Sequence, residues 1–156
     1  MSFQVSALPA HELAALFSLD DDALRARGAR RCVADRSPGF PCRVSLQDAE
    51  PGETVILTPF VHQPLDSPYR ASGPIFVRQA AAQARPAVGE VPALLRLRTL
   101  SVRAYDRDAL MVNAVVTDGR ELEAALASLL ENPDVDYLHV HFAGPGCYAC
   151  RVDRAQ

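Results

Sequence analysis

The stretch YLHVHFAGPGCYACRVDR, residues 137–154, carries the pattern of a β-hairpin that closes the fold. Its first half alternates in polarity, so Leu138 and Val140 point to one face while His139 and His141 point to the other. The segment AGPG separates it from a second run of strand-forming residues. The sequence therefore predicts two antiparallel strands with an apolar face against a core and a polar face that carries both histidines.

The pairing of these two strands decides which cysteine joins the histidines. A five-residue loop over residues 142–146 pairs His141 with Cys147 and leaves Cys150 on the apolar face. A four-residue loop would instead place Arg151 on the apolar side. Because a one-residue slip exchanges the two faces of a whole strand, the apolar pattern favours the five-residue loop. That pairing puts the candidate catalytic residues on one polar face: His139, His141, Cys147 and Arg151.

This polar face suits two kinds of chemistry. Histidine and cysteine are usual zinc ligands, so His139, His141 and Cys147 are candidate ligands of a divalent metal such as zinc, which would activate water for hydrolysis. His62 is the candidate fourth ligand. Alternatively, Cys147 and His141 act as thiol and base while Arg151 holds an anionic substrate. A solvated polar face without a site is the third interpretation.

Upstream, short strands alternate irregularly with helices. Residues 118–133, DGRELEAALASLLENP, form the clearest helix, with Asp118 as N-cap and leucines at helical spacing. Two further helices are expected over residues 9–19 and 20–28, and residues 92–98 could form a helical turn. Strands are expected over residues 3–8, 30–35, 42–46, 53–60, 74–79, 95–106 and 109–117. These elements predict an α+β fold: a single domain over residues 1–156, with a mainly antiparallel sheet of short strands, about three helices and a final β-hairpin.

Residues 61–74, VHQPLDSPYRASGP, interrupt the strand pattern. They contain three prolines and a glycine and show no periodicity, so a long loop is expected there. Tyr69 and Arg70 would present an aromatic ring and several hydrogen-bond donors from this loop, as a lid over an anionic ligand would. They are candidate substrate-binding residues, although a loop arginine is commonly just solvated.

The composition excludes several functions. All sixteen basic residues are arginine, so a Schiff-base lysine and a Walker-type phosphate-binding lysine are absent. The net charge is −3 with scattered charges, so neither nucleic acid nor a membrane is an expected partner, whereas a small-molecule ligand is possible. The chain opens without a signal-peptide pattern and contains no run of about eighteen apolar residues. A cytoplasmic protein with reduced thiols is therefore expected, and the oligomeric state stays open.

Three stretches resemble a known family: GFPCRVSLQDAEPGE (residues 39–53), SPYRASGPIFVR (residues 67–78) and the final stretch at residues 137–154. They are similar to the bacterial domain of unknown function 1203 family, in the same order along nearly the whole chain. The resemblance implies a stand-alone bacterial domain and supplies no substrate, cofactor or catalytic residue. An enzyme and a non-catalytic ligand-binding or assembly module without a metal are therefore both compatible with the sequence.

Overall fold

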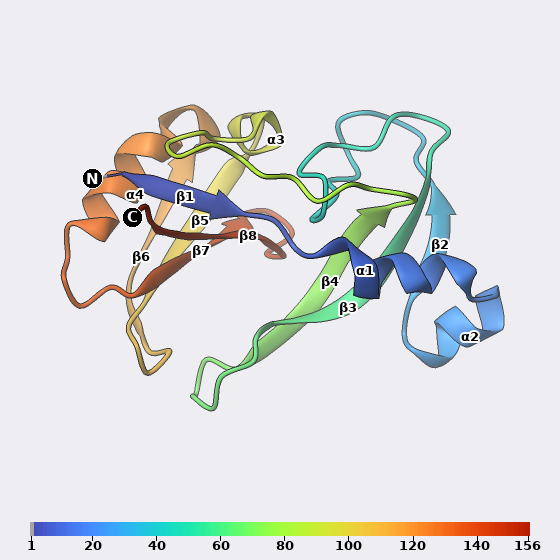
Figure 1. Ribbon diagram of the computed structural model, residues 1–156, viewed down its shortest axis with the longest axis horizontal. Helices are drawn as coiled ribbons and strands as arrows, with labels where there is room; N and C mark the ends of the chain where they lie inside the picture. The colour runs from blue at the N-terminus through green and yellow to red at the C-terminus, as the bar shows by residue number, and fades with distance from the viewer. Residues whose placement is uncertain (1) are drawn as a thin grey trace.

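The computed structural model describes residues 2–156 and confirms the α+β class, with strands dominant. The strands are β1 (Phe3–Ser6), β2 (Arg30–Val33), β3 (Thr54–Gln63), β4 (Ala71–Arg78), β5 (Thr99–Tyr105), β6 (Met111–Asp118), β7 (Tyr137–Phe142) and β8 (Tyr148–Arg154). Every strand pairing is antiparallel, and the chain ends in the predicted hairpin, β7–β8. The strands divide between two sheets, in the orders β1-β8-β7-β5-β6 and β2-β3-β4 (Figure 1).

Four α-helices lie within the described residues: α1 (Ala10–Ala14), α2 (Asp21–Ala26), α3 (Ala93–Arg96) and α4 (Leu122–Leu130). The three predicted helices are α1 with the 3-10 turn that follows it, α2 and α4. Asp20 caps α2, because its side chain accepts a hydrogen bond from the backbone N–H of Ala23 at 2.8 Å. Asp118 caps the 3-10 turn before α4 in the same way, through the N–H of Arg120 at 2.8 Å. The fourth helix, α3, is the helical turn that residues 92–98 suggested.

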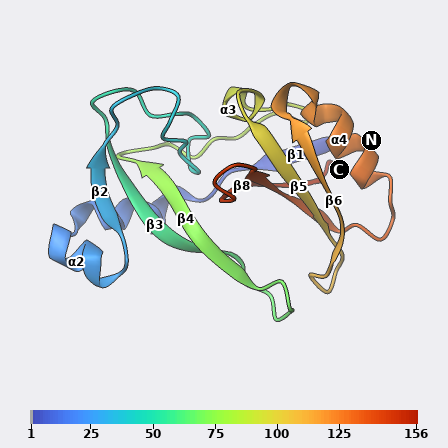
Figure 2. The ribbon, with the colours of Figure 1, turned by 180° about the vertical axis from the view of Figure 1, so that it is seen from behind.

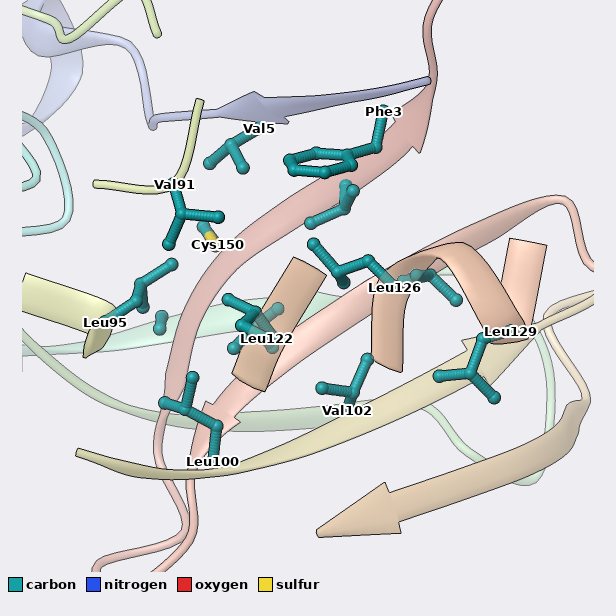
Figure 3. Packing of buried hydrophobic residues seen from close by; sticks show 14 of the residues in the cluster. Phe3, Val5, Val91, Leu95, Leu100, Val102, Leu122, Leu126, Leu129 and Cys150 are labelled. Carbon is teal, nitrogen blue, oxygen red and sulfur yellow. The ribbon is translucent and has the colours of Figure 1, made fainter. Parts of the chain in front are cut away.

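The main core lies between α4 and one face of the five-stranded sheet (Figure 3). Leu122 and Leu126 of α4 are completely buried against it, as their helical spacing predicted. On the sheet side, Leu138 and Val140 are completely buried and Cys150 is 1% exposed, so the predicted apolar face of the hairpin is confirmed. Because a buried leucine or valine contributes about 1.5–3 kcal/mol, this cluster determines which face of β7 turns toward the helices.

The opposite face of β7 is also covered, by the three-stranded sheet. His62 of β3 stacks on Tyr148 of β8, with ring centroids 5.6 Å apart. Gln63 Nε2 donates a hydrogen bond to the hydroxyl of Tyr137 at 2.8 Å. All six residues of β7 are consequently buried, so the interpretation of a solvated histidine face is wrong. The histidines lie between two sheets.

The long loop predicted over residues 61–74 is much shorter than expected. Strand β3 continues to Gln63 and β4 begins at Ala71, so the loop is only the tip of a long hairpin. Pro59 and Pro74 lie opposite each other within these strands, and their presence hid the strand pattern. The tip lies beside the β5–β6 turn in both ribbon views (Figures 1 and 2).

The strand predicted over residues 42–46 is also wrong. This segment forms turns that are anchored by isolated bridges, Pro41 to Asp48 and Cys42 to Phe76. Its alternating pattern reflects side-chain burial in a segment that does not pair as a strand. Cys42 is completely buried, and the backbone N–H of Arg78 contacts the sulfur of Cys42 at 3.3 Å. Alternation in so short a run does not distinguish a strand from a tightly packed turn.

Candidate metal centre

Three histidines meet where the two sheets face each other. His139 and His141 project from β7 of the five-stranded sheet, and His62 projects from β3 of the three-stranded sheet. One ring nitrogen of each lies within 4.8 Å of the other two. Alternation along β7 explains why His139 and His141 share a face. His62 joins them only through the contact between the sheets, which no local pattern encodes.

The spacing of the three nitrogens suits a metal ion. Atoms that lie within 4.8 Å of one another always share a point no farther from each than 4.8 Å divided by the square root of three, about 2.8 Å. A zinc–nitrogen bond is about 2.0–2.1 Å long. Each ring nitrogen would therefore move by less than about 1 Å, which small side-chain rotations supply without a change of rotamer.

Each of these rings also carries a buried nitrogen that has no hydrogen-bond partner within residues 2–156. The atoms are His62 Nδ1, His139 Nδ1 and His141 Nε2. Buried polar atoms in native proteins nearly always have a partner, and leaving one unpaired costs about 1–3 kcal/mol. These three atoms are available as ligand atoms for an ion that the three rings could share.

The turn between β7 and β8 orients one of the rings. Nδ1 of His141 lies 2.9 Å from the backbone oxygen of Gly146. A carbonyl oxygen only accepts, so Nδ1 carries the proton and Nε2 keeps its lone pair. A second partner of this kind is how proteins commonly orient a metal-binding histidine. Gly146 has a φ of 81°, a left-handed conformation that favours glycine, so this turn depends on that residue.

Burial keeps the histidines neutral near pH 7. Loss of hydration is the main cause that lowers the pKa of His139 from 6.5 to about 3, and the neighbouring His141 and His62 lower it further. Loss of hydration also lowers the pKa of His141 to about 4, against the opposing effect of the Gly146 carbonyl. The pKa of His62 is lowered by burial first and by Arg103 second. Metals bind the neutral form of histidine, so the site is electrostatically ready for a cation.

Tyrosine rings enclose the cluster. Tyr148 stacks on His62 with an angle of 8° between the planes, and its ring meets His139 edge-on at 5.2 Å. Tyr105 stacks on Tyr137 at 5.4 Å and also contacts His139 at 5.2 Å. These rings surround the cluster with apolar surface and lower the local polarity, which strengthens electrostatic interactions between a cation and its ligands.

Cys147 does not join the histidines. The pairing predicted between His141 and Cys147 is wrong, because His141 lies opposite Tyr148. The cause is a β-bulge: Ala149 is an extra residue, and the residues before it exchange faces. Tyr148 thereby takes the histidine face, and the sulfur of Cys147 lies instead 3.0 Å from Nη2 of Arg43. The structure brings His62 into the place that the sequence assigned to this cysteine.

Arg151 lies on the histidine face, opposite His139 in the β7–β8 pairing. Its guanidinium forms a two-pronged ion pair with Asp153, at 2.7 Å from Nη2 and 2.9 Å from Nε, and lies 4.2 Å above the ring of Tyr137. Its positive charge contributes to the lowered pKa of His139. Arg151 therefore flanks the cluster and is already held by a carboxylate.

Arg103 is a flanking residue that the sequence did not single out. It lies on β5 opposite His139, and its charge lowers the pKa of all three clustered histidines. Nε donates a weak hydrogen bond to Ser101 Oγ at 3.4 Å, and no carboxylate in the described part of the chain pairs with Arg103. The pairing of β5 with β7 is the signal that would have found it, and that pairing is not visible locally.

The two candidate residues of the predicted lid lie at the tip of the β3–β4 hairpin. Tyr69 is 40% exposed and meets Tyr105 edge-on at 6.1 Å, so it reaches the outer edge of the tyrosine shell. Arg70 is exposed and donates to the backbone oxygen of Pro64 at 3.1 Å, within its own turn. The structure thus brings Tyr69, but not Arg70, toward the histidines.

Fold and cluster together define an α+β protein in which two antiparallel sheets enclose three histidines. The chain belongs to the family described as Protein of unknown function (DUF1203), whose sequence profile matches residues 39–154. This confirms the resemblance, and the matched range includes all three clustered histidines. Comparison with curated proteins and with solved structures gives no significant match.

Proposed function

We propose that the protein binds one divalent metal ion of the zinc type through His62, His139 and His141, and that the metal activates water to hydrolyse a small anionic substrate. The observation that carries this proposal is the convergence of three imidazoles, two buried and one half-buried, each with an unpaired ring nitrogen. In this ligand set His62, first considered as a fourth ligand, takes the place of Cys147.

The ligand types favour zinc or a similar transition metal over magnesium or calcium. The cluster consists of three neutral imidazoles and includes no carboxylate. Imidazole suits zinc, copper, nickel and iron, whereas magnesium and calcium prefer oxygen ligands. Three protein ligands leave a fourth position of a tetrahedral zinc free for water, which is the arrangement typical of catalytic sites.

The surroundings suit a hydrolytic reaction on an anion. A zinc ion held by these histidines would act as a Lewis acid and would lower the pKa of a bound water to about 7. Arg103 and Arg151 flank the cluster and would attract and orient an anionic group of the substrate. Arg103 is the better placed of the two, since it has no carboxylate partner within residues 2–156.

The cellular setting forms part of the same proposal. We place the protein in a bacterial cytoplasm, where its four cysteines would stay reduced, as their free state in the structure suits. Its partner would be a small molecule, not nucleic acid or a membrane, in keeping with its scattered charges. Separately, none of the helices in residues 2–156 is both long and apolar enough to cross a membrane.

Metal analysis of protein purified without a histidine tag tests the proposal. After addition and removal of excess zinc, we expect one zinc per chain. His62→Ala should weaken binding at least tenfold, whereas His11→Ala, at a 79% exposed side chain, is the matched control and should not. Cys147→Ser should bind zinc like the wild type. Much less than one zinc per chain, unchanged by His62→Ala, would contradict the proposal.

A structural metal is the second candidate, favoured by the burial of His139 and His141, which are 4% and 1% exposed. A metal held by histidines of both sheets would tie β3 to β7 without turning over a substrate. The zinc-loaded protein distinguishes the two roles with p-nitrophenyl phosphate and p-nitrophenyl acetate as probes. Zinc-dependent hydrolysis that His62→Ala abolishes supports the enzyme, and a zinc-dependent rise in Tm without hydrolysis supports the structural role.

A further inference from the structure

A pocket of about 630 Å³ opens beside the β7–β8 turn. Its lining includes Pro41, Arg43, Phe76, Arg98, Phe142 and Cys147. Three arginines line it, Arg36, Arg43 and Arg98, and no aspartate or glutamate does. Its walls therefore combine apolar surface with positive charge. A cavity of this size and character is typical of small-molecule sites. None of the three clustered histidines lines it.

Arg43 is the unusual residue of this pocket, because it is charged and only 1% exposed. Nε donates to the backbone oxygen of Tyr148 at 2.7 Å, Nη1 to that of Pro41 at 2.5 Å, and Nη2 to the sulfur of Cys147 at 3.0 Å. No carboxylate in the described residues forms an ion pair with it. Burying a charge without an opposite charge beside it is energetically costly.

Cys147 is the side chain that contacts Arg43 within the pocket lining. A neighbouring arginine stabilises the negative charge that develops on a sulfur as it attacks, and the other two contacts of Arg43 are neutral carbonyl oxygens. A guanidinium also has five N–H groups, of which the three hydrogen bonds account for three. The remaining N–H groups are donors for an acceptor on a bound ligand. Cys147 itself is half-buried and lines the pocket, so a small molecule can reach its sulfur.

Arg98 forms the second charged part of the wall. Asp48 holds it through two contacts, at 2.6 Å and 3.0 Å, which fix the guanidinium in place. It lies 5.0 Å from the ring of Phe142, and Arg43 lies 4.9 Å from the same ring. Two guanidinium groups beside one aromatic ring suit a ligand with an apolar body and a carboxylate, because arginine binds carboxylates in a charge-assisted way.

We propose that this pocket binds a small organic electrophile that carries a carboxylate, and that Cys147, whose sulfur lies against the guanidinium of Arg43, is its nucleophile. The sulfur forms a bond to the electrophilic carbon while the bond between that carbon and its leaving group breaks. The leaving group departs with the electron pair, and the proton of the thiol is released to water. This site is separate from the histidine cluster and needs no metal.

Alkylation kinetics test the proposal, with iodoacetate as the carboxylate probe and iodoacetamide as its neutral analogue. Cys32 is the internal control, since it is also half-buried and burial raises its pKa. Peptide mass spectrometry after brief labelling at pH 7 should show Cys147 alkylated at least tenfold faster than Cys32. The ratio of iodoacetate to iodoacetamide rates should also be several-fold higher at Cys147. Equal rates at the two cysteines, or equal ratios, would overturn the proposal.

Two further measurements sharpen this test. Arg43→Gln should slow the labelling of Cys147 at least tenfold, with far-UV circular dichroism to check folding. If that variant does not fold, the comparison of Cys147 with Cys32 in the wild-type protein still tests the proposal. Zinc should leave the labelling rate of Cys147 unchanged, because this cysteine lies outside the histidine cluster. Protection of Cys147 by zinc would show that the two sites are not separate. The proposal for Cys147 does not depend on whether the histidines bind a metal.

Discussion

Mild acid is predicted to destabilise the metal-free protein. In the folded state the pKa values of His139 and His141 are lowered to about 3 and about 4, chiefly by burial, whereas an unfolded chain titrates near 6.5. Between these values the unfolded state binds more protons than the folded state. The contribution of these histidines to the free energy of unfolding is therefore complete above pH 6.5 and decreases as the pH falls. Each histidine removes up to about 1.4 kcal/mol per pH unit. Together they should remove about 2–3 kcal/mol between pH 6 and pH 5, a large part of a typical stability of about 5–15 kcal/mol.

Urea unfolding followed by circular dichroism, in the presence of a chelator, measures this loss at pH 7, 6 and 5. This range lies above the pH at which carboxylates titrate, so the histidines dominate the slope. The double variant His139→Gln/His141→Gln should show a much flatter dependence of stability on pH. His11→Ala should keep the wild-type slope, because His11 is exposed. A free energy of unfolding that differs by less than about 0.5 kcal/mol between pH 6 and pH 5 would refute the reasoning.

Two further predictions concern the stability of the fold. Gly119→Ala should cost more than about 2 kcal/mol, because its Cβ would lie 1.9 Å from a backbone oxygen of α3, whereas Gly73→Ala meets nothing within 4 Å and is the control. Equal Tm values for these two variants would contradict this. Asp48→Ala should cost about 3–5 kcal/mol, because it leaves Arg98, with an 18% exposed side chain, without its carboxylate. Asp35→Ala, at a 72% exposed carboxylate, should cost less than about 1 kcal/mol in denaturant titrations, and similar losses would refute the distinction.

The apolar side of the fold was predictable because its signals are local. Leu122 and Leu126 recur at helical spacing, and Leu138 and Val140 alternate along a strand. Each pattern identifies a buried face without reference to distant residues, and the structure buries all four side chains completely. The capping role of Asp118 is likewise a local signal, because its side chain accepts a hydrogen bond from the backbone N–H of Arg120, two residues away. The class of fold and the orientation of β7 follow from such signals.

The residue of β8 that lies opposite His141 was not predictable, because a β-bulge shifts the pairing of the two strands. An uninterrupted ladder has to place Tyr148 and Cys150 on the same face, since they are two residues apart. The extra residue, Ala149, removes that constraint, so Cys150 enters the core while Tyr148 faces His141. Burying Cys150 and Tyr148 on opposite sides satisfies both sheets at once, and only the presence of the second sheet makes this favourable.

His62 illustrates the other limit of sequence reasoning. Prolines on both sides of it, Pro59 and Pro64, are typical of loops, and the alternation of β3 is broken where the pairing with β4 becomes irregular. It was considered as a ligand for its residue type and for its place at the start of the loop predicted over residues 61–74. Its position opposite β7 follows from the packing of one sheet on another, which depends on many residues far apart in the sequence.

The energetics of the cluster argue that folding alone does not account for it. Three unpaired buried nitrogens cost about 1–3 kcal/mol each, an amount that approaches the whole stability of a typical domain. Phenylalanine or leucine would fill the same space between the sheets without that cost and without the loss of stability in acid. A metal ion would offset it, because structural zinc contributes about 10–16 kcal/mol of binding free energy near neutral pH. These energetics support the proposal that the protein binds a cation between its two sheets.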